Sequence, residues 1–453
     1  MKKLLLGSTA LVAGGLMAAP AMAADPIKIG VGGYYTFYAA AGHMDSIYNL
    51  TTGASMQFRG FNFIQEGEIH FIGQTKLDNG TTIGLTVELE ANSSTTGGNA
   101  GASVIDEAFM FAFGSWGRVE FGSRDSASYR MYYGSPSALI GWGWFQHNHQ
   151  WSPIAAANKA YRGGISTTST PNWQDVNRIN VFTPRFAGFQ IGVGYAPKVN
   201  SAPAAGTGLA TGPGAAFNGC GFAGSINAGF CTTNDYTHQD AFDIGINYLN
   251  KFGDFTVALY AAYAYAWFVP GFVGGAGAAA SANIATGANL TNHAQWVAGL
   301  QFGIAGFTIG GAFGWDNNGI GRNWYTHVDN DTRFYTAAIM YETGPWQVSA
   351  GWAGFRNTNG NGSSPVGALP FGGGPGFTAA GSSAAAFGQN IATGALAFGA
   401  ESVDKYEIGA NYALAPGVKM VGGVMYYDLQ APGTNPLARH KSWVFLLGMD
   451  FRF

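Results

Sequence analysis

The sequence of 453 residues carries few charges: 10% of its residues are charged, 15% are aromatic, and 70 are glycine. Soluble domains carry roughly 25% charged residues, so this composition argues against an ordinary soluble domain and suits a wall that faces lipid. The net charge of −3 becomes −5 if Lys2 and Lys3 are removed, because 20 basic residues then oppose 25 acidic ones. The chain therefore lacks the excess of positive charge that is typical of nucleic-acid-binding proteins.

The amino end has the pattern of a secretory signal peptide. Two lysines precede the apolar run 4–19, and Ala21-Met22-Ala23 offers a small-x-small cleavage site. We therefore expect residues 1–23 to be removed and residues 24–453 to form a single domain. A membrane helix is the poorer interpretation because the run is short and is broken by glycine and proline. Export then leaves a soluble periplasmic protein or an outer-membrane barrel.

The first half of the chain shows alternation of apolar and polar side chains with period two, which is typical of half-buried strands. Residues 28–38 and 82–90 follow this pattern. Two more strands are expected at 109–113 and 118–124, joined by the turn Ser115-Trp116-Gly117. Mean hydropathy is +0.06, as expected where lipid-facing and lumen-facing residues cancel along each strand.

An Asp-Asn-Gly turn at 78–80 predicts a hairpin between the strand before it and residues 82–90. Pairing across this turn places Glu68 near Glu90 and His70 near Glu88. One wall of a lumen would then carry an acidic patch, composed of Glu66, Glu68, Glu88 and Glu90.

Short turns alternate with long segments along the rest of the chain. Short turns are expected at 183–188, 250–254, 303–306, 342–345 and 414–417. Long segments are expected near 41–55, 91–104, 125–176, 199–238, 268–292, 316–331, 357–402 and 431–439. This alternation indicates an all-β, transmembrane antiparallel barrel of about sixteen strands with short periplasmic turns and long external loops.

The last thirteen residues, 441–453, alternate strictly, with six large apolar side chains on one face. A chain seldom ends on such a strand unless something pairs with it, because an open edge invites aggregation. We therefore expect the last strand to pair with the first and close the barrel.

Several motifs resemble those of one known family. They are Ile29 to Tyr35, Asp106 to Phe109, Gly117 to Gly122, Asn180 to Val193 and the terminal Phe451-Arg452-Phe453. The chain resembles the trimeric general diffusion porins of alphaproteobacteria. The resemblance implies a sixteen-stranded barrel, a homotrimer, and a third loop folded into the lumen as a constriction.

The third long segment, 125–176, is therefore the expected constriction loop. Its charges are few and slightly basic, whereas porins of this family usually place acids on the inserted loop. We hypothesise a transverse field between the acidic patch and arginines of the loop or wall, which favours hydrated dipolar solutes. The alternative is that these side chains are solvated and simply compensate one another. The candidate pore-lining residues are Glu66, Glu68, His70, Glu88, Glu90, Arg118, Glu120, Arg124, Asp125, Arg130 and Arg178.

Other residue groups allow weaker hypotheses. Aromatic residues of the third segment form either a sugar-stacking track or packing contacts; they are Trp142, Trp144, Phe145, Trp151 and Trp173. His147 and His149 form a conceivable metal pair, and the glutamates near Glu68 and Glu90 could hold calcium. No other cofactor is expected. Cys220 and Cys231 share one external loop of an exported chain, which predicts a disulfide.

We expect an outer-membrane channel of a Gram-negative bacterium through which small hydrophilic solutes diffuse passively, filtered by size and charge. Its expected partners are two further copies of itself, membrane lipid and lipopolysaccharide. No G-x-S-x-G, H-E-x-x-H or P-loop motif is present, so we expect no enzyme. A substrate-selective channel, for example for sugars, and a surface adhesion or structural barrel are the alternatives.

Overall fold

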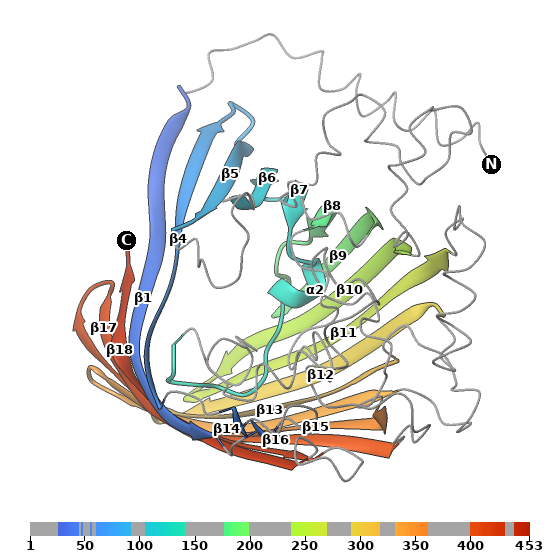
Figure 1. The fold of residues 1–453 in the computed structure, drawn as a ribbon. Helices are drawn as coiled ribbons and strands as arrows, with labels where there is room; N and C mark the ends of the chain where they lie inside the picture. The colour runs from blue at the N-terminus through green and yellow to red at the C-terminus, as the bar shows by residue number, and fades with distance from the viewer. Residues whose placement is uncertain are drawn as a thin grey trace, which may run out of the picture.

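The protein is a closed antiparallel barrel of sixteen strands (Figure 1). The computed structural model describes residues 26–44, 47–48, 55–56, 60–91, 105–140, 176–198, 237–269, 291–317, 331–360, 399–430 and 439–453. The all-β barrel predicted from the sequence is confirmed. The expected signal peptide lies outside the described residues and stays a prediction.

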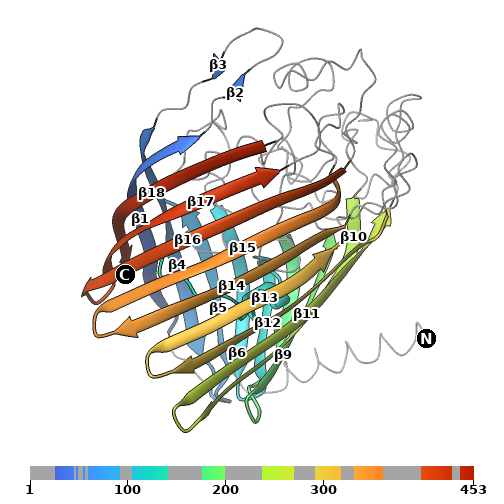
Figure 2. The same ribbon diagram turned by 90° about the horizontal axis from the view of Figure 1, so that it is seen from below.

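Each barrel strand from β5 onward pairs with the strand that precedes it in the chain (Figure 2). The barrel strands are β1 (Lys28–Met44), β4 (Phe61–Lys76), β5 (Thr82–Glu90), β6 (Ile105–Gly114), β7 (Gly117–Arg124), β8 (Val176–Phe182), β9 (Phe189–Lys198), β10 (Thr237–Phe252), β11 (Phe255–Val269), β12 (His293–Ile304), β13 (Phe307–Asp316), β14 (Thr332–Thr343), β15 (Trp346–Gly360), β16 (Gly399–Ala415), β17 (Val418–Gln430) and β18 (Arg439–Arg452). The short strands β2 (Ile47–Tyr48) and β3 (Ser55–Met56) form a separate sheet.

The carboxyl-terminal strand closes the barrel, as expected. β1 pairs with β18, so that Tyr35 lies opposite Phe451 and Phe37 opposite Met449. The other edge of β1 pairs with β4. Both edges of the first strand are therefore occupied, and the sheet has no open edge.

Side chains alternate between an outward apolar face and an inward polar face. On β5, β6 and β7, Leu85, Met110 and Phe121 are 47%, 61% and 42% exposed, whereas Glu88 and Glu120 are buried. Such a surface needs lipid around it, since water would not solvate a continuous apolar band. In the described part of the chain, no helix is long and apolar enough to cross a membrane.

Two features of the strands go beyond the sequence analysis. β1 continues to Met44 rather than ending near residue 38. On β6, Phe109 and Phe111 are buried on the lumen face, because β6 and β7 pair with Phe111 opposite Glu120. The guanidinium of Arg118 lies 4.7 Å from the Phe111 ring centre and covers it, which makes an inward phenylalanine tolerable.

Candidate functional site

Residues 125–140, here called the inserted segment, leave the end of β7 and lie inside the ring of strands (Figure 1). The segment begins with the single helical turn α2 (Ala127–Arg130). So short a helix is unstable alone, and the wall holds it: Asp243 accepts a hydrogen bond from the Ser128 amide at 2.7 Å. Arg178 pairs with the same carboxylate at 3.3 Å. The first anchor of the inserted segment is therefore a buried ion pair between β8 and β10.

The middle of the inserted segment lies close against β12. Gln301 donates a hydrogen bond to the Gly134 carbonyl at 2.7 Å. Nearby, Gly299 leaves room for the backbone of the segment, because a Cβ atom there would lie 1.9 Å from the Tyr133 carbonyl oxygen. A glycine at this inward position is thus required by the approach of the segment.

The end of the described segment reaches the opposite side of the barrel. Ser137 donates to Glu407 on β16 at 2.5 Å, and Lys405 lies 3.4 Å from the same carboxylate. Tyr38 on β1 donates to the Ile140 carbonyl at 2.7 Å. The inserted segment therefore runs along the inner wall from β8 to β1 and narrows the bore, which confirms for residues 125–140 the expected insertion of the third loop.

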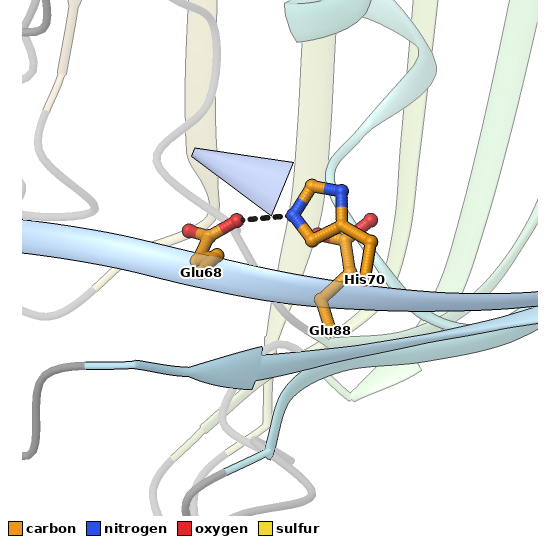
Figure 3. Close-up of side chains that lie close together, drawn as sticks. All are labelled: Glu68, His70 and Glu88. Carbon is orange, nitrogen blue, oxygen red and sulfur yellow. Dashed lines mark hydrogen bonds and ion pairs between the residues drawn. The ribbon is translucent and has the colours of Figure 1, made fainter. Parts of the chain in front are cut away.

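The strands that the inserted segment leaves uncovered carry the predicted acidic patch. β4 and β5 pair with Glu68 opposite Glu90 and His70 opposite Glu88, as predicted. The His70 Nε2 atom lies 2.8 Å from Glu68 Oε2 (Figure 3). Tyr34 of β1 donates to the other oxygen of Glu68 at 3.0 Å. The patch is thus ordered by contacts across three neighbouring strands.

The sequence interpretation missed two acids on β6. The β5–β6 register shifts between Val87 and Leu89, which pair with Ala108 and Ile105, so two residues of β6 stand opposite Glu88 alone. Such a bulge re-aims side chains, and Asp106 and Glu107 both join the patch. The break in alternation at Asp106-Glu107 is the only sequence signal for it. We call the carboxylates of β4 to β6 the acidic wall; they are Glu66, Glu68, Glu88, Glu90, Asp106 and Glu107.

The four predicted arginines each lie beside a carboxylate. The pairs are Arg124 with Glu88 and Glu107, Arg118 and Arg130 with Glu120, and Arg178 with Asp243. Three of these arginines compensate acids on β5 to β7, and the fourth is buried under α2. This arrangement differs from the hypothesis of arginines facing the acidic patch across the bore. Whether the predicted residues line the constriction stays a prediction.

Asp125 occupies the point where the inserted segment leaves the wall. Its amide donates to Glu107 at 2.9 Å, and its carbonyl accepts from the Asn180 side chain at 2.8 Å. Burial raises the pKa of the Asp125 carboxyl above its usual value, while Arg124, Arg178 and Arg130 oppose the shift. Asp125 therefore retains its proton to a higher pH than a free aspartate.

Two groups of side chains on β4 to β6 bring metal-ligating atoms within 4.8 Å of one another. One is Glu68, His70 and Glu88, and the other is Glu68, Glu90 and Asp106. The second fits the calcium hypothesis, which stays a prediction. The aromatic residues 142–173 of the third segment, the pair His147 and His149, and the cysteines Cys220 and Cys231 lie outside the described residues.

A family model described as Gram-negative porin matches residues 7–432. Among solved structures, an anion-selective porin from Comamonas acidovorans is similar, with 13% identity, a TM-score of 0.50, and coverage of 94% of this chain and 100% of that chain. A loop-L8 deletion mutant of OmpT, an outer membrane protein of Vibrio cholerae, shows 10% identity, a TM-score of 0.50, and coverage of 94% and 99%. No curated protein matches the chain.

At these identities the solved structures support the fold alone, whereas the family model covers nearly the whole chain. Sixteen strands leave an aqueous channel in a barrel, and the inserted segment narrows it. Porins of this family and fold are channels and not enzymes. The chain therefore belongs to the Gram-negative porin family and forms an outer-membrane barrel for passive diffusion of small hydrophilic solutes.

Proposed function

We propose that the channel favours cations and hydrated dipolar solutes, which the acidic wall attracts as they pass the inserted segment. The supporting observation is the charge balance on β4 to β6: six carboxylates gather there, and Arg124 of β7 pairs with two of them. Rings or patches of carboxylates set cation preference in channels. Their field extends about 8–10 Å at physiological ionic strength, which is enough to act on ions in a narrowed bore.

The experiment is a reversal-potential measurement on the purified protein in a planar bilayer with a salt gradient. The wild type should reverse toward the cation potential, and a Glu68→Gln, Glu90→Gln variant should move toward anions. Glu342→Gln, which neutralises an exposed acid near a short turn, is the control and should reverse with the wild type. An anion-preferring wild type, like that named for the Comamonas porin, would overturn the proposal.

The same experiment separates the two alternatives. A substrate-selective channel predicts a saturable reduction of current when a sugar is added. A surface adhesion or structural barrel predicts a silent bilayer, because its lumen would be plugged. Steady current without sugar block is the result that passive diffusion requires.

We further propose that the subunits assemble as a homotrimer through the outer face of β1 and β4. Tyr35 and Gln65 point outward there, and the tyrosine hydroxyl donates to the amide oxygen at 2.6 Å. Polar side chains on the outside of a membrane protein are expensive in lipid and act as glue between packed elements. Gly67, opposite Tyr35 on β4, lets the tyrosine ring lie flat against the strand, because a Cβ atom there would lie 2.7 Å from the Tyr35 Cδ2 atom.

The trimer is tested by cross-linking single-cysteine variants in the outer membrane. Gln65→Cys should give linked subunits with a short bifunctional reagent, whereas Ile244→Cys, on the outer face of β10, should not. Linkage at residue 244 and not at 65 would place the contact on another face. A monomer mass for the purified barrel in detergent would refute the assembly itself.

A further inference from the structure

We propose that Glu68, His70 and Glu88 form a binding site for a divalent transition metal such as Zn²⁺ on the lumen wall. One ligand atom from each side chain lies within 4.8 Å of the other two. Two donors on one tetrahedral zinc ion lie about 3.4 Å apart, since each bond is about 2.0–2.2 Å long. Small side-chain rotations therefore bring the three atoms to bonding distance.

The strand register fixes these three side chains relative to one another. Glu68 and His70 are two residues apart on β4, so they share the lumen face. His70 stands directly opposite Glu88 on β5, and opposite residues in an antiparallel pair have Cβ atoms about 4.5–5.5 Å apart. Figure 3 shows the imidazole above Glu88 and directed at the Glu68 carboxylate. The arrangement is thus held by the sheet rather than by a loop.

The donor set selects the class of metal. One imidazole and two carboxylates suit zinc and its neighbours, whereas calcium requires six to eight oxygen ligands. The adjacent group of Glu68, Glu90 and Asp106 offers only oxygens. The presence of His70 therefore distinguishes a zinc-type site from the calcium site expected at Glu68 and Glu90.

Neighbouring residues orient both carboxylates and leave the site open to the lumen. Tyr34 donates to Glu68 Oε1 at 3.0 Å, and Arg124 donates to Glu88 Oε1 at 3.1 Å. Partners of this kind commonly fix the ligands of metal sites. The side chains of His70, Glu68 and Glu88 are 27%, 16% and 11% exposed, so an ion in the bore can reach them.

Metal binding would replace the contact between His70 and Glu68. The Nε2 atom of a neutral imidazole gives its lone pair to the metal, while its remaining proton stays on Nδ1. Any proton held between Nε2 and Glu68 is released to water, because metal ligands bind deprotonated. The bound ion would neutralise both glutamates, and water would complete its coordination from the lumen side.

The test is calorimetric titration of the purified full chain in detergent with Zn²⁺ and, separately, Ca²⁺. The background for all samples is a His147→Gln, His149→Gln variant, which removes the two histidines of the third segment. In this background His70→Gln removes a ligand, Tyr34→Phe removes an orienting contact, and His293→Gln is the matched control. His293 is also a lumen-side histidine beside an acid, Asp316, at 2.7 Å, but it belongs to neither metal-ligating group found among the described residues.

The expected result is one zinc per chain, with affinity reduced by Tyr34→Phe by the roughly 10–100-fold typical of orienting contacts, and reduced further by His70→Gln. His293→Gln should bind like the background, and calcium binding should not respond to His70→Gln. Equal zinc affinity with and without His70 would overturn the proposal, as would loss of zinc in the His293 control. If His70→Gln does not fold, the Tyr34→Phe result decides. Calorimetry needs no ion current, so this outcome is independent of the proposed cation preference.

Discussion

The two halves of the inner wall use the same barrel pattern for different purposes. From β4 to β7 the inward positions carry carboxylates and arginines that face the bore. From β8 to β17 the inward positions are mostly small or uncharged, and the inserted segment lies on them. The few charged groups there, such as Asp243 and Glu407, are buried under the segment and hold its polar groups. Charge beneath the segment therefore anchors it, whereas for the charge that faces the bore we propose electrostatic filtering.

The contrast teaches how a wide barrel is narrowed without a second domain. A segment without regular structure must satisfy its backbone groups when it is buried. The strands beneath the segment supply side-chain donors for this purpose. Gln301 donates to the Gly134 carbonyl at 2.7 Å, Asn247 to the Met131 carbonyl at 3.0 Å, and Asn411 to the Ala138 carbonyl at 2.8 Å. On β4 to β7 the contact is of a different kind: Glu107 accepts a hydrogen bond from the Asp125 amide at 2.9 Å, and Glu120 pairs with Arg130.

The largest effect is expected from Asp243→Ala, which removes an anchor of the inserted segment. The variant removes the carboxylate that faces Arg178 and the Ser128 amide, and both are buried. Losing one partner of a buried ion pair costs about 3–5 kcal/mol. We expect lower thermal stability of the barrel and a noisier, larger single-channel conductance as the segment leaves the wall. Unchanged conductance and stability would show that this anchor is dispensable.

The next largest effect is expected from Gly299→Ala, which fills space beneath the segment without changing any charge. The new Cβ atom would meet the Tyr133 carbonyl at 1.9 Å, and overpacking of this kind costs roughly 1–3 kcal/mol. The segment should be displaced into the bore and reduce conductance. Gly303→Ala is the matched control on the same face of β12, because its nearest neighbour lies at an ordinary 3.4 Å. Equal conductance in both variants would contradict the close packing of the segment.

The strands and their pairing could be predicted because they depend on local alternation and on turn residues. The Asp78-Asn79-Gly80 turn alone places Glu68 opposite Glu90. The course of the inserted segment could not be predicted from the sequence. It depends on contacts such as that between Tyr38 and Ile140, which lie 102 positions apart in the chain. Alternation also shows which residues share a face but not which face is inward, as Phe109 and Phe111 illustrate. The bulge at Asp106 depends on register, which no single strand encodes.

The next smaller effect is expected from Arg124→Gln, which tests the charge of the wall formed by β4 to β7. Arg124 pairs with Glu88 at 3.1 Å and with Glu107, so its removal leaves the acidic wall one charge more negative. A unit charge about 4 Å away contributes roughly 1 kcal/mol in a water-like dielectric. We expect the cation-to-anion permeability ratio to rise about fivefold, because 1.4 kcal/mol corresponds to a factor of ten. A shift toward anions in the reversal potential would contradict the assignment of this wall as the filter.

The smallest effect is expected from a variant on β1, the strand between the two regions of the inner wall. Tyr38→Phe removes the hydroxyl that donates to the Ile140 carbonyl at 2.7 Å and leaves the buried ring in place. A single neutral hydrogen bond contributes about 0.5–1.5 kcal/mol, so the barrel should stay folded while the end of the segment becomes looser. More frequent current fluctuations at unchanged mean conductance are expected, with Tyr426→Phe on the outer face of β17 as the control. Because the anchors at Asp243 and Glu407 remain, a collapse of conductance in Tyr38→Phe would mean that the segment is held mainly from β1.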